Sequence, residues 1–200
     1  MIFGRDLRRC RDSGRQATLL VAGVAVLAVL VPGCGGGGGD SQAVGLYNAY
    51  RAAEDQRNDA ESRLRQSFSD ISAAAQAEDR QGVLAAARRG RQAAEDSDRL
   101  IAAELEAARG LGRIDEVSAD GKRLAEGLGL SRQSLALTTQ ELDIALSDPF
   151  LAERADDVQR LARRSTRLAV QGELEIRRAD HAIAIALGLE PRPDRAATTG

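Results

Sequence analysis

Several residue types that usually build catalytic and binding sites are scarce in this chain of 200 residues. It has no tryptophan, aromatic residues make up 2% of it, and His181 is its one histidine. The shortage of aromatic residues argues against a β-sandwich or barrel and against an aromatic-lined ligand pocket. Arg178 stands three residues before His181, so the Glu-x-x-His pair of bundle di-metal sites is missing. We therefore predict no metal site, no cofactor and no enzymatic activity.

Cysteines are also too few for a structural framework. Cys10 lies among the N-terminal arginines and Cys34 follows an apolar run, so no CxxC site or disulfide pair is available to the rest of the chain. A domain without disulfides has to be held together by packing.

Charge of one sign is not in excess either. The formal net charge is −2, and the first 33 residues hold five arginines and two aspartates, so the remainder is more acidic than the whole. This balance excludes an electrostatic nucleic-acid binder. The densest basic patches, 88–91 and 160–164, fit contact with an anionic partner, but a solvent-facing surface balanced by nearby acids is the favoured interpretation. Three adjacent carboxylate pairs are also expected to face solvent, because neighbouring helix positions point apart: Glu54-Asp55, Glu95-Asp96 and Asp156-Asp157.

The N-terminal segment has the order of an export signal. Five arginines between positions 5 and 15 precede an uncharged apolar run, 17–31. Positive residues stay on the cytoplasmic side, so the chain after this run is expected to be exported.

The end of this run continues into the stretch Leu30-Val31-Pro32-Gly33-Cys34. This stretch resembles the lipobox of bacterial lipoproteins, with an aliphatic residue three positions before the cysteine and a small residue directly before it. Pro32 departs from the usual Ala, Ser or Thr. The resemblance implies cleavage between Gly33 and Cys34 and a diacylglyceryl group on Cys34, often with an added N-acyl chain. Two or more acyl chains suffice for stable anchoring.

The resulting domain organisation is a signal peptide (1–33), a lipidated cysteine with a glycine-rich tether (34–40), a helical bundle (41–188) and a disordered tail (189–200). The predicted location is the extracytoplasmic side of the cell membrane, with the lipid as anchor. The alternative is an uncleaved signal anchor, which would make the chain a single-pass membrane protein. Its apolar run of fifteen residues is shorter than the roughly 20 that a membrane span needs.

After the tether, strong helix formers dominate, and apolar residues recur at three- and four-residue spacing. They predict long helices over 41–77, 80–109, 113–147 and 149–187. The buried stripe predicted for the last helix consists of Leu151, Ala155, Val158, Ala162, Ala169, Ile176, Ala179, Ile183 and Ala186. Short connections between long helices favour an antiparallel, up-down four-helix bundle. Tyr47 and Tyr50 are expected in its core, with a membrane-interface position as the alternative. The polar stretch 54–63 is expected to pack thinly or lie exposed.

Helix ends are predicted from their chemistry. Ser41 and Asp79 are expected to cap the first and second helices, and Gly110-Leu111-Gly112 to end the second with a glycine in the left-handed conformation. Gly127 and Gly129 predict a kink, after which Ser131 could cap a restarted helix. Further predictions concern the fourth helix: Asp148 caps it, Pro149 occupies its first position, and Gly188 and Pro191 stop it.

The sequence therefore favours an interaction or structural role at the cell envelope. We expect a protein partner and contact with the membrane through the lipid, and we leave homo-oligomerisation open. The alternative is a ligand-sensing or substrate-binding envelope module. That alternative predicts a polar, solvent-accessible gap near the middle of the first helix and the glycines at 127 and 129.

Overall fold

The structure, a computed structural model, describes residues 38–150 and 153–192. Within these residues it is all-helical and contains no strand, which confirms the predicted fold class. Its elements, in chain order, are α1 (Gly38–Gln76), α2 (Arg80–Leu111), the short 3-10 helix η1 (Asp115–Val117), α3 (Ser118–Ser147) and α4 (Ala155–Ala186).

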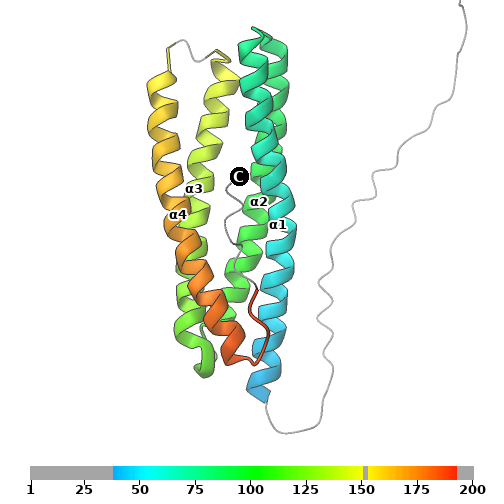
Figure 1. The fold of residues 1–200 in the computed structure, drawn as a ribbon, viewed down its shortest axis with the longest axis vertical. Coiled ribbons are helices and arrows are strands. Elements are labelled where there is room, and N and C mark those ends of the chain that lie inside the picture. Colours follow the sequence, from blue (N-terminus) through cyan, green and yellow to red (C-terminus); the bar gives the residue numbers. More distant parts are fainter. Residues whose placement is uncertain (1–37, 151–152, 193–200) are drawn as a thin grey trace, which may run out of the picture. The chain divides into compact units, whose positions relative to one another are not determined.

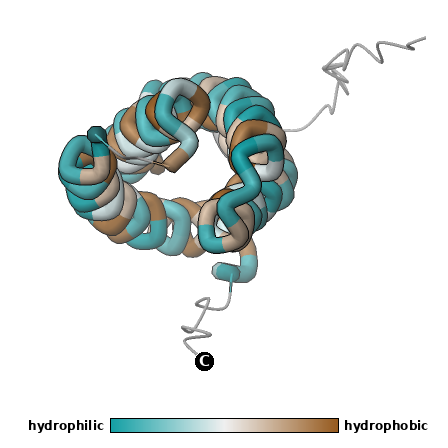
Figure 2. The backbone as a smooth tube through the Cα atoms, turned by 90° about the horizontal axis from the view of Figure 1, so that it is seen from above, coloured by the Kyte–Doolittle hydropathy of each residue, from teal (hydrophilic) through white to brown (hydrophobic). Residues whose placement is uncertain are grey.

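Successive helices run antiparallel and form the predicted up-down bundle (Figure 1). α1 packs on α2, α2 on α3 and α3 on α4, whereas α1 and α4 are not among the closely packed pairs of the described residues. Seen along the bundle, the helices lie around one centre, and hydrophobic and hydrophilic segments alternate along each of them (Figure 2). The bundle is therefore closed on three sides and loosely joined on the fourth.

The first helix begins earlier than predicted. It starts at Gly38, so Ser41 lies inside it and is not its N-cap. Gly38 and Gly39, assigned to the tether from sequence, are part of the helix, and residues 34–37 lie outside the described residues. Once a long helix is nucleated, each added residue gains a backbone hydrogen bond, which offsets much of the cost of glycine.

The ends of α2 confirm one prediction and correct another. Asp79 is its N-cap, and its Oδ1 accepts a hydrogen bond of 2.9 Å from the amide of Gly82. Gly112 follows the helix with a φ of −62°, so the predicted left-handed conformation is wrong. A close approach occurs here instead: a Cβ added at Gly121 would lie 2.4 Å from the Gly112 nitrogen. Glycine at 121 is thus required by backbone packing.

α3 also differs from expectation at its start and in its middle. It begins at Ser118 and not near residue 113, because η1 occupies the connection. It runs without interruption through Gly127 and Gly129, so the helix does not restart there and Ser131 caps nothing. Packing explains the continuity, since a Cβ added at Gly127 would lie 2.8 Å from the carbonyl oxygen of Gly172 on α4.

α4 begins at Ala155, six residues later than predicted, so Pro149 is not in its first turn. Asp148 does not cap it. Its Oδ2 accepts from the amide of Glu153 at 3.2 Å, within the connection. The predicted stop is confirmed, because Gly188 follows the helix with a φ of +66°.

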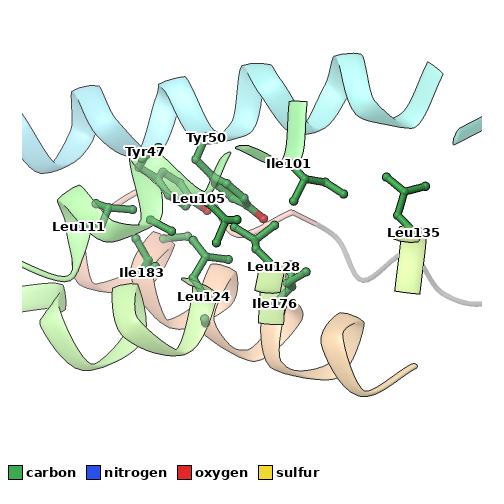
Figure 3. Packing of buried hydrophobic residues seen from close by; sticks show 14 of the residues in the cluster. Tyr47, Tyr50, Ile101, Leu105, Leu111, Leu124, Leu128, Leu135, Ile176 and Ile183 are labelled. Atoms are coloured by element: carbon green, nitrogen blue, oxygen red, sulfur yellow. The ribbon is translucent and has the colours of Figure 1, made fainter. Parts of the chain in front are cut away.

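The predicted seams supply the core. Tyr47 and Tyr50 are 1% and 0% exposed, which confirms the core position predicted for both. They reach from α1 towards leucine and isoleucine side chains of the other helices (Figure 3). The largest fully buried side chains include these two and Ile101, Leu111, Leu124, Leu128, Leu142 and Ile183.

α4 contributes to the core mainly through its second half. Its buried residues are Ser165, Gly172, Ile176, Ala179, Ile183 and Ala184. Three alanines predicted on its buried stripe are exposed instead: Ala155, Ala169 and Ala186. Leu151, also predicted there, lies outside the described residues. Small residues in the first half bury little area, so they do not draw α4 onto α1.

The residues after α4 return across the bundle. Leu189 packs against the core, and Arg192 binds α1, with Nη1 at 2.5 Å from Glu54 Oε2 and Nη2 at 2.9 Å from Asp55 Oδ1. This part of the segment expected to be a disordered tail is thus ordered. Residues 193–200 lie outside the described residues.

Candidate functional site

A cleft of about 740 Å³ opens in the middle of the bundle between α1 and α4. It lies on the side of the bundle where the neighbouring helices α1 and α4 are not closely packed. Its floor includes Ile101 of α2 and Leu135 of α3, and its α1 wall includes Leu64 and Phe68. The opposite wall is α4 from Ser165 to Arg177. Most of this surface is apolar, with charged groups at its rim and at one end.

That charged end is built around Arg57, whose side chain is 8% exposed. Its Nε donates to Glu104 Oε1 of α2 at 2.7 Å, and its Nη1 donates to Glu61. The carboxylate of Glu104 is fully buried, and its Oε2 has no hydrogen-bond partner among the described residues. An ion pair thus crosses from the cleft wall into the core.

Burial and the opposite charge of the partner both shift the pKa values of this pair. Burial raises the pKa of Glu104 to about 7, although the neighbouring Arg57 lowers it. For Arg57, burial opposes the charged form, but Glu104 and Glu61 hold its pKa above the ordinary value. The guanidinium therefore stays charged, and the carboxylate needs it to ionise in the core.

A hydroxyl cluster lies on the α3–α4 side of the cleft. Ser134 Oγ donates to the Ser165 carbonyl oxygen at 2.9 Å and lies 2.9 Å from Ser165 Oγ, which is also 2.9 Å from Thr138 Oγ1. Each hydroxyl is satisfied by another hydroxyl or a backbone carbonyl. No histidine lines the cleft, so the cluster has no imidazole to activate a nucleophile and serves to join the two helices.

The rim carries charges of both signs. On α1, Glu61 Oε2 lies 3.9 Å from Arg65 Nη1, and on α4 Glu173 Oε1 lies 2.6 Å from Arg177 Nε. Each wall therefore presents one acid and one base a helical turn apart. Neither sign prevails at the mouth of the cleft.

Below the cleft, a polar cluster holds the end of α4 against α1. Tyr47 OH donates to Asp180 Oδ1 at 2.8 Å, and Arg51 Nε donates to Tyr47 OH at 2.9 Å. Arg51 Nη2 also lies 3.3 Å from Asp180 Oδ2. Burial, reinforced by Asp180, raises the pKa of Tyr47 above its ordinary value, so the phenol keeps the proton it donates. These contacts close one end of the α1–α4 side.

The residues singled out from sequence are not brought together. Gly33 and Cys34 lie outside the described residues. His181 is exposed on α4 and does not line the cleft. The basic patches face solvent with acidic partners, as favoured from sequence: Arg89 pairs with Asp70, Arg91 with Asp143 and Glu95, and Arg160 with Asp157.

Sequence reasoning missed the buried pair of Arg57 and Glu104, and the prediction that 54–63 packs thinly or lies exposed is wrong at Arg57. A signal was present for each residue. Glu104 lies three residues after Ile101 and four before Ala108, so a charge occupies a seam position. Arg57 likewise lies seven residues after Tyr50 and seven before Leu64 on α1.

No known protein family matches this chain, and neither the curated proteins nor the solved structures contain a match to it. Among the described residues, no helix combines the length and hydropathy required to cross a bilayer. That part of the chain also lacks any cluster of three or more histidine, cysteine or acidic side chains suited to a metal ion.

Proposed function

We propose that this chain is an exported bacterial lipoprotein whose helical bundle has an interaction role on the extracytoplasmic side of the cell membrane. The observation that carries the interaction role is the open cleft between α1 and α4, where a soluble four-helix bundle would otherwise bury its seam. Apolar surface left open in this way is typical of a docking site.

The membrane anchor rests on the N-terminal sequence. Arginines, an apolar run and the lipobox-like stretch ending at Cys34 occur in the order that export and lipidation require. The bundle itself begins at Gly38, four residues after Cys34. So short a connection would hold the domain next to the membrane surface.

The same cleft supports a second candidate, a ligand-sensing or substrate-binding envelope module. The cleft lies beside the polar middle of α1, at Arg57 and Glu61, but its surface is mostly apolar and Gly127 and Gly129 do not line it, so it matches only part of the gap that this alternative predicts. A ligand there would face a mostly apolar surface with a few polar groups at one end, as small-molecule sites commonly do. Such a ligand would also meet Arg57, which is already paired with Glu104 and Glu61.

The anchor is tested by the intact mass of the membrane-extracted protein beside a Cys34→Ala variant. We expect a wild-type chain that begins at Cys34 and carries the diacylglyceryl mass, and we expect the variant to lack both. A chain that begins at Met1 in both samples would refute lipidation and favour the signal-anchored alternative.

A further inference from the structure

The cleft is bordered by apolar side chains that the bundle leaves in solvent. Four large hydrophobic residues of the described chain are exposed, and two of them line the cleft: Val170 is 55% and Leu174 49% exposed. They stand four residues apart on α4 and so lie on one face, a helical turn apart. We call these two residues the α4 ridge.

Apolar side chains also line the groove beside this ridge. Leu64 and Phe68 of α1 are also four residues apart, and Ile101 and Leu135 lie beneath them. Over the eleven residue steps from Arg57 to Phe68, the α1 wall is about 17 Å long at 1.5 Å per residue. An apolar ridge on α4 thus borders a groove of about three helical turns, which is apolar at Leu64 and Phe68 and charged at its Arg57 end.

The rim charges indicate what kind of occupant fits. Glu61 with Arg65 and Glu173 with Arg177 put one acid and one base on each side, so an anionic or a cationic ligand gains nothing from the sign of the site. A twofold axis between two α4 helices would place the acid of one copy opposite the base of the other. The rims of two copies would therefore be complementary in charge.

We propose that a second copy of this chain docks on the open α1–α4 side, with the α4 ridge of each copy in the groove of the other. Such an interface is isologous, because the same patch serves both partners. This inference rests on the proposed interaction role and names its partner.

The test is co-purification of two differently tagged full-length copies, crosslinked in their membranes before extraction. Wild-type copies are expected to recover each other. Leu174→Glu is expected to lower the recovery at least tenfold, because two carboxylates would enter the apolar interface. The matched control is Ile185→Glu, since Ile185 is 59% exposed on the same helix but does not line the cleft; its recovery should equal the wild type. Circular dichroism establishes that both variants remain helical.

The same co-purification assay also tests the arrangement of the rim charges. Glu173→Arg in one copy and Arg177→Glu in the other should pair with each other at least several-fold better than either variant pairs with itself. Equal recovery in all combinations would overturn the twofold arrangement.

Failure of this inference is distinguishable from failure of the proposed function. Wild-type copies that do not recover each other, or equal losses in Leu174→Glu and Ile185→Glu, would overturn self-docking. If a different protein is then crosslinked at position 174, the interaction role stands with another partner. A co-purified acyl compound lost on Leu174→Glu would instead favour the ligand-binding alternative, and the Cys34 mass measurement is independent of both.

Discussion

At the scale of single residues, the pair formed by Arg57 and Glu104 is the least expected feature of the bundle. Both side chains are buried, and Glu104 reaches into a core that is built mainly of apolar side chains. Removing the charges from water costs several kcal/mol per ion, so the pair contributes little net stability as long as both partners are present. Replacing one partner should therefore lower the free energy of unfolding far more than replacing both partners.

We therefore predict that Arg57→Ala lowers the free energy of unfolding by about 3–5 kcal/mol, because Glu104 is left buried without a counter-charge. The double variant Arg57→Met, Glu104→Leu should lose much less, or gain stability, because it replaces the ions by apolar side chains of similar volume. Urea unfolding followed by circular dichroism measures both. A double variant as unstable as the single one would show that desolvation of the charges is not the dominant cost.

At the scale of the helices, two glycines with the same local sequence have opposite roles. Gly127 and Gly129 are both buried or half-buried positions of α3, each followed by a leucine. A Cβ at Gly127 would meet the Gly172 carbonyl oxygen at 2.8 Å, whereas a Cβ at Gly129 has nothing within 4 Å. The first allows α3 and α4 to approach closely, and the second is required by no contact.

Alanine substitution should separate the two roles. Gly127→Ala is expected to lower stability by about 1–3 kcal/mol, because the backbones of α3 and α4 must move apart. Gly129→Ala, its matched control, should raise stability by about 1 kcal/mol, since alanine is the better helix former. Thermal unfolding of the two variants beside the wild type gives the signs. Effects of equal sign would refute the assignment of close packing to Gly127 alone.

These glycines also show how far sequence reasoning extends. The four helices, the cap at Asp79 and the stop at Gly188 follow from local chemistry and spacing, and all were predictable. The continuity of α3 was not, because it depends on Gly172, 45 positions along the chain from Gly127. The alternative function required a polar gap near the middle of α1 and near Gly127 and Gly129, whereas the observed cleft is mostly apolar and those glycines do not line it. Its ion pair was missed because Arg57 was judged by its polar neighbours and not by its position in the seam.

At the scale of the whole bundle, one end of the α1–α4 side is closed and its middle is open. Tyr47, Arg51 and Asp180 join the two helices at the closed end, and Arg192 adds a second link to α1. Further along, α4 is not closely packed on α1, and the cleft opens between them beside α4 residues 165–177. α4 is therefore joined to α1 near its C-terminal end but borders an open cleft in its middle.

This asymmetry predicts a gradient of local stability in α4. Five of its six buried residues lie in 172–184, and Ser165 is the only one before them among the described residues of the helix. Amide hydrogen exchange should be at least tenfold faster over 155–169 than over 172–186, because helix segments with few buried contacts open more easily. α2 is the internal control, since its buried residues extend from Val83 to Leu111 and its two halves should exchange at similar rates. Uniform protection along α4 would refute the gradient, and fast exchange in both helices would mean that the whole bundle opens as one unit.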